Sequence, residues 1–301
     1  MPVQCTHYSA AGDLSATQLL CHTANSLLVM AVAPTLMNPA YPGLVAVVFY
    51  LIGSYLQMRD FRARRISASK TLVLLGLPAV LLHGLTSYLL VVATGGLNLG
   101  LFSVLCLTSF VLASLVLIAS FRQPLHNLFL FVFPLSALGV LCGIYLRSDF
   151  EPLAQLSRPL VGHILLSIFA YTVLLLAACQ SIVLAVQENA LRDKREIAVL
   201  RLLPPLQTME ALLFQWLFIG LALLTLAIVS GFLFLDNMFE QRVVHHTILA
   251  LASWLVFCGL LIGRWRLGWR GMTATRWTLL GFLLLLLGYL GSKFVVEVLL
   301  S

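Results

Sequence analysis

The sequence predicts an all-α fold, a polytopic transmembrane bundle of about eight helices with both ends of the bundle outside the cytoplasm. Hydrophobic residues make up 61% of the 301 positions and charged residues only 10%, against roughly 45–50% and 25% in a soluble domain. The charged residues are also clustered. None lies between Lys70 and Arg122, a stretch long enough for two bilayer crossings of about 20 residues each. These observations exclude a water-soluble globular protein.

Charges and turn residues delimit the spans one after another. The first ends at Arg59, and the second and third fill the charge-free stretch up to Arg122. The turn cluster at 94–98 separates these two, and it is short enough to make them antiparallel neighbours. The fourth span ends before Arg147, the next three occupy further charge-free stretches, and the eighth follows Arg276. The predicted spans are residues 42–58, 71–92, 99–120, 128–146, 160–186, 211–235, 245–263 and 277–296.

The distribution of lysine and arginine predicts the orientation, because cytoplasmic loops retain positive charge during insertion. If the segment after the first span is cytoplasmic, fourteen of the 18 lysines and arginines lie inside. This asymmetry places both ends of the bundle outside. It also explains the net charge of +7 by contact with anionic lipid, so we expect the lipid bilayer and no nucleic acid as a partner.

Residues 1–36 form an uncertain N-terminal extension ahead of a single membrane domain at 37–301. The extension holds no lysine or arginine, so it lacks the charged region of a signal peptide. Three interpretations stay open: a start assigned too far upstream, a flexible or interfacial extension, or a ninth span at 18–36.

Histidines inside the spans are the candidate site residues, because ionisable groups in a bilayer are costly. His163 opens span five, and the pair His245 and His246 opens span seven, both at the predicted outer face. Two imidazoles from separate helices at one depth can ligate a haem iron from both sides. Of the pair we choose His246, which aligns with Trp254 along the helix. His83, about 14 Å from the outer end of span two, is a further candidate ligand or hydrogen-bond donor.

The alternative is structural. Helix-start histidines are tolerated in the headgroup zone, and neighbouring polar groups can satisfy His83. Ser167 and Tyr171 follow His163 at i+4 and i+8 and form one inward stripe with it. They would orient the imidazole through its second nitrogen or serve as interhelical hydrogen bonds.

The sequence contains no CxxCH, so haem is not expected to be attached covalently. It also contains no HExxH, no GxSxG and no P-loop. We therefore expect no catalytic residues, no metal beyond haem iron, and no enzymatic activity.

Four segments carry a family resemblance: 163–171, 224–231, 252–255 and the glycines and aromatics of 268–291. They resemble the membrane-spanning cytochrome c assembly family, and the resemblance covers residues 155–301. His83 and the 96–100 hairpin are similar to the smaller HemX-like or YpjD-like inner-membrane branch, which extends the resemblance to nearly all of the chain after Met37. It implies haem ligation at His163, with His246 and His83 as partners.

The chain also departs from the family pattern. Full cytochrome c synthases carry a tryptophan-rich segment of the WGxxWxWD type, whereas the corresponding loop at 236–242 has no tryptophan. Gly263 and Arg264 stand where the family has a histidine, and no histidine follows span eight. The resemblance therefore does not imply ligase activity.

We accordingly expect a multi-pass protein of the bacterial inner membrane that binds or handles haem b non-covalently in support of cytochrome biogenesis. Its expected partners are other cytochrome assembly or haem-handling membrane proteins. The alternatives are a structural subunit of a membrane complex without haem and a small-solute transporter. Against a transporter, the spans lack buried acidic residues and paired broken helices.

Overall fold

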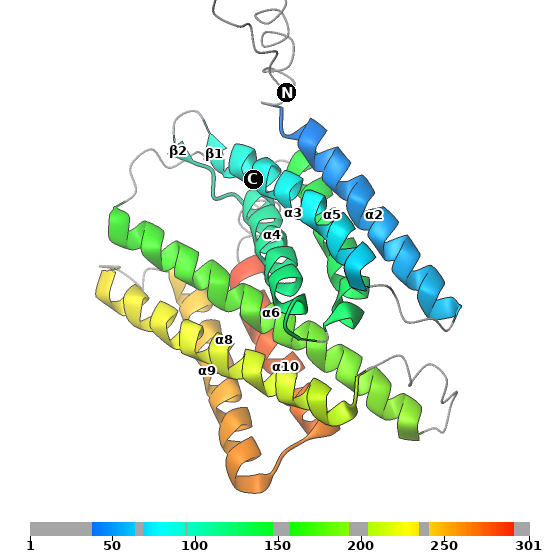
Figure 1. Ribbon diagram of the computed structural model, residues 1–301. Helices are drawn as coiled ribbons and strands as arrows, with labels where there is room; N and C mark the ends of the chain where they lie inside the picture. The colour runs from blue at the N-terminus through cyan, green and yellow to red at the C-terminus, as the bar shows by residue number, and fades with distance from the viewer. Residues whose placement is uncertain are drawn as a thin grey trace, which may run out of the picture.

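The computed structural model describes residues 38–63, 69–93, 96–123, 125–146, 157–192, 204–234 and 241–291. The predicted extension at 1–36 lies outside the described residues. Within them the chain forms eight long helices (Figure 1): α2 (Ala40–Arg62), α3 (Ser69–Val91), α4 (Leu101–Ser120), α5 (Phe129–Tyr145), α6 (Arg158–Arg192), α8 (Leu206–Phe234), α9 (Gln241–Leu267) and α10 (Gly271–Leu286). A turn of 3-10 helix, η1 (His126–Leu128), precedes α5. A turn of π helix, η2 (Leu287–Gly291), follows α10.

Each predicted span coincides with one of these helices, which confirms the all-α polytopic bundle. Seven helices are long and apolar enough to cross a membrane, and α5, with 17 residues, is shorter. The number of helices agrees with the prediction, whereas some helix ends differ from the predicted ones. The prediction ended span five at residue 186 and began span eight at 277, whereas α6 continues to Arg192 and α10 begins at Gly271. Charges mark where a helix leaves the membrane, and α6 continues beyond that point to Arg192, whose positive charge interacts favourably with the dipole at the end of the helix.

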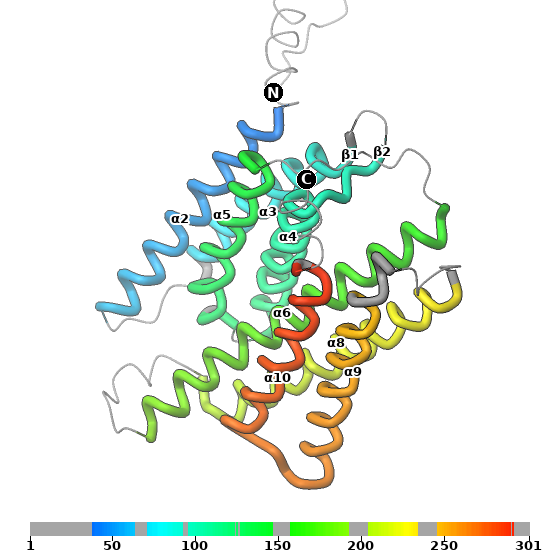
Figure 2. The backbone as a smooth tube through the Cα atoms, turned by 180° about the vertical axis from the view of Figure 1, so that it is seen from behind, coloured from blue at the N-terminus to red at the C-terminus, as the bar shows by residue number. Residues whose placement is uncertain are grey.

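The eight helices pack as two groups of four (Figure 1), α2 to α5 and α6 to α10, which meet where α4 packs on α6. Figure 2 shows the second group from behind, with α9 and α10 in front of α6 and α8. A small antiparallel hairpin, β1 (Val92–Ala93) and β2 (Gly96–Leu97), joins α3 to α4. The short connection and the packing of α3 against α4 agree with the predicted antiparallel neighbours, whereas the two short strands were not predicted.

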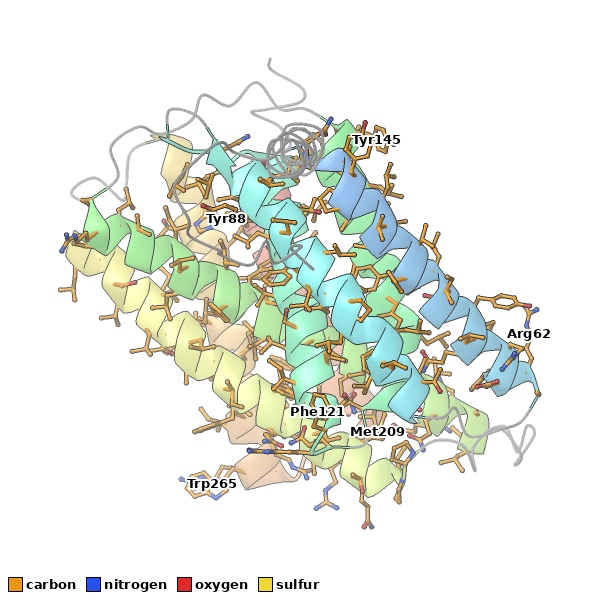
Figure 3. The ribbon with its side chains drawn as sticks, turned by 45° about the horizontal axis from the view of Figure 1, so that its top comes forward. Arg62, Tyr88, Phe121, Tyr145, Met209 and Trp265 are labelled. Atoms are coloured by element: carbon orange, nitrogen blue, oxygen red, sulfur yellow. The ribbon has the colours of Figure 1, made fainter. Side chains whose placement is uncertain are left out.

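We call the end of the bundle that carries this hairpin the hairpin end. There Leu97 and Leu99 pack in one apolar cluster with Ile164 and Ile168 of α6 and with Tyr289 of η2. The start of α6 and the end of α10 therefore lie at the hairpin end. In Figure 3, Tyr88 and Tyr145 lie near this end, whereas Phe121, Met209 and Trp265 lie near the opposite one.

At the opposite end, ion pairs join α8 to the last turn of α9 and to the turn between α9 and α10. The buried carboxylate of Glu210 lies 2.5 Å from the Arg264 guanidinium and 4.0 Å from that of Arg270. The turn itself uses Gly268 and Gly271 at φ values of 67° and 53°, a left-handed conformation that glycine adopts without steric cost. This anchored turn positions α9 and α10 against α6 and α8.

Candidate functional site

His163 lies in the second turn of α6 and faces α8. Its Nδ1 atom lies 2.9 Å from the Ser230 hydroxyl, which in turn donates a hydrogen bond of 2.9 Å to the carbonyl oxygen of Ala227. The side chain is half-buried, so the imidazole is held at the edge of the bundle with one nitrogen in a hydrogen bond.

His246 lies in the second turn of α9, at the same end of the bundle. Its ring meets the Tyr289 ring edge-on, with 5.9 Å between the centroids and an interplanar angle of 70°. The structure places both histidines at this end, because Tyr289, which contacts His246, packs in one apolar cluster with Ile164, the residue after His163. The side chain of His245 lies outside the described part of the molecule.

Aromatic side chains line the space between α6 and α10 next to the histidines. The Tyr171 ring lies 6.1 Å from that of Tyr289 and 5.4 Å from that of Phe282, measured between centroids. We call His163, Ser230, His246, Tyr171 and Tyr289 the two-histidine site. Its members come from α6, α8, α9 and η2, and it combines two imidazoles with flat rings that suit a flat aromatic ligand.

His163 has a partner that the sequence did not predict. Ser167 and Tyr171 were expected either to orient the ring or to form interhelical hydrogen bonds, and the structure places Ser167 half-buried on the same helix. The nitrogen instead meets Ser230 on the neighbouring helix. A polar side chain four residues away on the same helix can be predicted from the sequence. A partner on another helix cannot, because it depends on how the helices are rotated about their axes.

Trp254, with which His246 aligns along α9, makes a hydrogen bond to a neighbouring helix. Trp254, two turns after His246, donates from its indole N–H to the Thr225 hydroxyl of α8 at 2.8 Å. Thr225 and Ser230 therefore both connect α8 to its neighbours, one to α9 and one to α6. Their occurrence as polar residues within the apolar segment 224–231 is the signal that could have identified Ser230 beforehand.

His83 lies elsewhere, in the centre of the α2–α5 group, and is fully buried. Its Nδ1 lies 3.1 Å from the Tyr50 hydroxyl, and its Nε2 lies 3.1 Å from the carbonyl oxygen of Cys106. A carbonyl oxygen only accepts, so Nε2 carries the proton and Nδ1 accepts from Tyr50. Both ring nitrogens are occupied, and these partners belong to α2 and α4. The structure therefore brings together two of the three predicted histidines, and His83 is not with them.

The described residues hold no group of three or more histidine, cysteine or acidic side chains arranged to bind a metal ion. A cavity of about 310 Å³ opens at the hairpin end of the α2–α5 group. It is lined by Pro39, Leu90, Asn98, Phe102, Ser103, Gly143, Ile144 and Leu146. None of the predicted site residues lines it.

Comparison with known proteins gives a consistent picture. The sequence model of the family described as "Cytochrome C assembly protein" matches residues 71–300, most of the chain. The inner membrane protein YpjD of Escherichia coli K12 is 28% identical over 202 residues, covering 67% of this chain and 76% of YpjD.

Two other relatives match shorter regions. A protein of Azospirillum brasilense, described as an uncharacterized 28.8 kDa protein in the nifR3-like 5′ region, is 38% identical over 46% of this chain and 52% of its own length. Protein HemX of Brevibacillus brevis is 27% identical over 45% of this chain and 50% of its own length. No solved structure matches. Taken with the apolar helices of membrane-spanning length, the match over most of the chain shows that this multi-pass protein of the bacterial inner membrane belongs to the cytochrome c assembly protein family.

Proposed function

We propose that this protein binds haem b non-covalently at the two-histidine site and holds it as cargo during cytochrome biogenesis, without catalysing a reaction itself. One observation carries the proposal: His163 of α6 and His246 of α9 both lie at the hairpin end of the bundle, where Tyr289 contacts His246 and packs in one cluster with Ile164, the residue after His163. Imidazole nitrogen is the commonest axial ligand that a protein offers to haem iron.

The surroundings of the two imidazoles support a porphyrin rather than a bare ion. A structural zinc or copper site uses three or four protein ligands, whereas two suffice for haem because the macrocycle supplies the other four. Tyr171 and Tyr289 add ring surface between the helices. Both histidines are only half-buried, so a ligand from the membrane has a short path to them.

The position of the site also fits the proposal. It lies at the hairpin end, which the distribution of lysine and arginine predicts to be outside the cytoplasm. Apocytochrome c receives its haem on that side, according to the family resemblance. The partners would then be other cytochrome assembly or haem-handling membrane proteins, to which the haem is passed or from which it is taken.

The absence of tryptophan from residues 236–242 supports a role without ligation chemistry. In the full cytochrome c synthases of the family that this chain resembles, a tryptophan-rich segment presents haem to the apocytochrome. This chain has His163 and His246 but lacks that segment and two of the histidines of the family pattern, so we propose binding or storage of haem and not its covalent attachment.

The test is a haem titration of the purified protein in detergent. We expect a saturable Soret band at one haem per chain, lost in His163→Ala and weakened in His246→Ala. His245→Ala, which changes the other histidine of the predicted pair, is the matched control and should leave the band unchanged. A folded wild-type protein without a Soret band would refute haem binding and favour the structural subunit.

A further inference from the structure

We infer that Ser230 fixes His163 in a single tautomer, so that His163 is the anchored ligand of the two-histidine site and His246 the exchangeable one. The second half of this inference rests on the proposed function, since it concerns a bound haem. The first half concerns the protein alone and can be tested without haem.

The assignment of the tautomer follows from counting protons. The Ser230 hydroxyl has one hydrogen and lies 2.9 Å from two atoms, the carbonyl oxygen of Ala227 and Nδ1 of His163. A carbonyl oxygen can only accept. If the hydroxyl pointed at His163, its oxygen would face the Ala227 oxygen with no proton between them. The favourable arrangement therefore has Ser230 donating to Ala227 and accepting from the N–H of His163.

This tautomer leaves the other nitrogen ready for a metal. With the proton on Nδ1, the Nε2 atom of His163 carries a free lone pair, which is what an axial ligand needs. Nearly all metal-bound histidines donate their second nitrogen in this way, and the hydrogen bond also fixes the plane of the ring. Ser230 thus acts on the iron through His163 and is a positioning residue.

His246 lacks such a partner. Its ring packs edge-on against Tyr289, and neither ring nitrogen makes a hydrogen bond to any other residue in the described part of the chain. No contact of that kind selects a tautomer or resists rotation about the bond to the ring. Of the two candidate ligands, His163 is hydrogen-bonded to a neighbouring helix, whereas His246 is held among the described residues by ring packing alone.

This asymmetry suits a protein that must release its cargo. With both imidazoles fixed, either one would rebind quickly after its bond broke, and release of haem would be slow. With only His163 fixed, His246 would be the residue that a partner's ligand replaces first. We therefore expect an order of ligand exchange.

The tautomer is tested by nitrogen NMR of the protein labelled at histidine, in detergent and without haem. The resonances of His163 are assigned by their loss in His163→Gln. We expect Nδ1 protonated in the wild type and in Ser230→Thr, which keeps the hydroxyl, and a mixture of both tautomers in Ser230→Ala. Ser167→Ala, on the same stripe of α6, is the matched control and should give the wild-type spectrum. Protonation at Nε2 in the wild type would overturn the inference, whether or not the protein binds haem.

The order of exchange is tested on the haem-loaded protein. Ser230→Ala should weaken haem binding by about tenfold to a hundredfold, the usual effect of removing such a partner, and Ser230→Thr should restore it. Added imidazole should displace His246 from the wild type at low concentration and rebuild the wild-type spectrum in His246→Ala. If imidazole replaces His163 first, the assignment of the two ligands is wrong. If no haem binds while the NMR result holds, only the proposed function fails.

Discussion

Replacing His83 by alanine should destabilise the protein without changing its affinity for haem. The imidazole is fully buried between α2 and α4 and uses both of its nitrogens, one toward the Tyr50 hydroxyl and one toward the Cys106 carbonyl. Its ring also lies edge-on to the rings of Tyr50 and Phe110, each 5.7 Å away between centroids. Alanine removes all of these contacts at once.

The cost can be built up from its parts. The Tyr50 hydroxyl, which is itself fully buried, would lose its acceptor, and an unsatisfied buried polar group costs about 1–3 kcal/mol. Hydrogen bonds between membrane helices average only about 0.6 kcal/mol, which favours the lower part of that range. The cavity left by the ring adds a packing penalty of about 1–2 kcal/mol after partial relaxation. We expect a total of about 2–4 kcal/mol.

The assay is denaturant unfolding in detergent, followed by tryptophan fluorescence, with a haem titration of the folded variant alongside. Tyr50→Phe and the double variant complete a cycle, in which the two changes should couple by about 1 kcal/mol because the residues are in direct contact. A His83→Ala protein as stable as the wild type, but without a Soret band, would refute this reasoning and make His83 a ligand.

Two further expectations concern packing and orientation. A Cβ atom at Gly143 would lie 2.9 Å from Cys106 Cβ and 3.0 Å from Leu90 Cδ1, whereas one at Gly162 would meet nothing within 4 Å. Gly143→Ala should therefore destabilise the protein by about 1–3 kcal/mol, and Gly162→Ala should be neutral or stabilising by up to about 1 kcal/mol. Equal effects of the two changes in the same unfolding assay would contradict the helix contacts. A reporter that is active only outside the cytoplasm should be silent when fused at Lys194 and active at Ser301, and the reverse pattern would place the two-histidine site on the cytoplasmic side.

The helices could be predicted from the sequence because a bilayer imposes its own length on them. A stretch of apolar residues near 20 in length, bounded by charges, has few alternatives to a spanning helix. The ends were less predictable. α6 carries Glu188 and Arg192 within its last turns, since a helix can extend beyond the membrane wherever its neighbours support it. Here Gln187 supports it, donating a hydrogen bond of 2.9 Å to the Pro204 carbonyl just before α8.

The site was predictable only in part, and for a physical reason. That His163 and His246 share a depth follows from both of them opening helices at one face. Which polar group each imidazole meets depends on the rotation of α6, α8 and α9 about their axes, and a hydrophobic pattern that runs all around a membrane helix does not encode that rotation. Ser230 was therefore missed, and His83 could not be separated from the other two histidines.

Hydrogen-bond accounting separates these histidines where depth in the membrane does not. His83 has both nitrogens engaged, His163 has one engaged with Ser230, and His246 has none engaged within the described residues. His83 has no lone pair left for a ligand, because its Nδ1 accepts from Tyr50. His163 engages only its N–H side in the tautomer that we infer, so its Nε2 lone pair stays available to iron. The α2–α5 group, with its satisfied polar centre, then serves as the rigid scaffold against which α6 is held. The α6–α10 group carries both candidate ligands, His163 and His246, at its hairpin end, and ionisable side chains within a membrane are retained at a cost, so it is this group that we expect to contact the cargo.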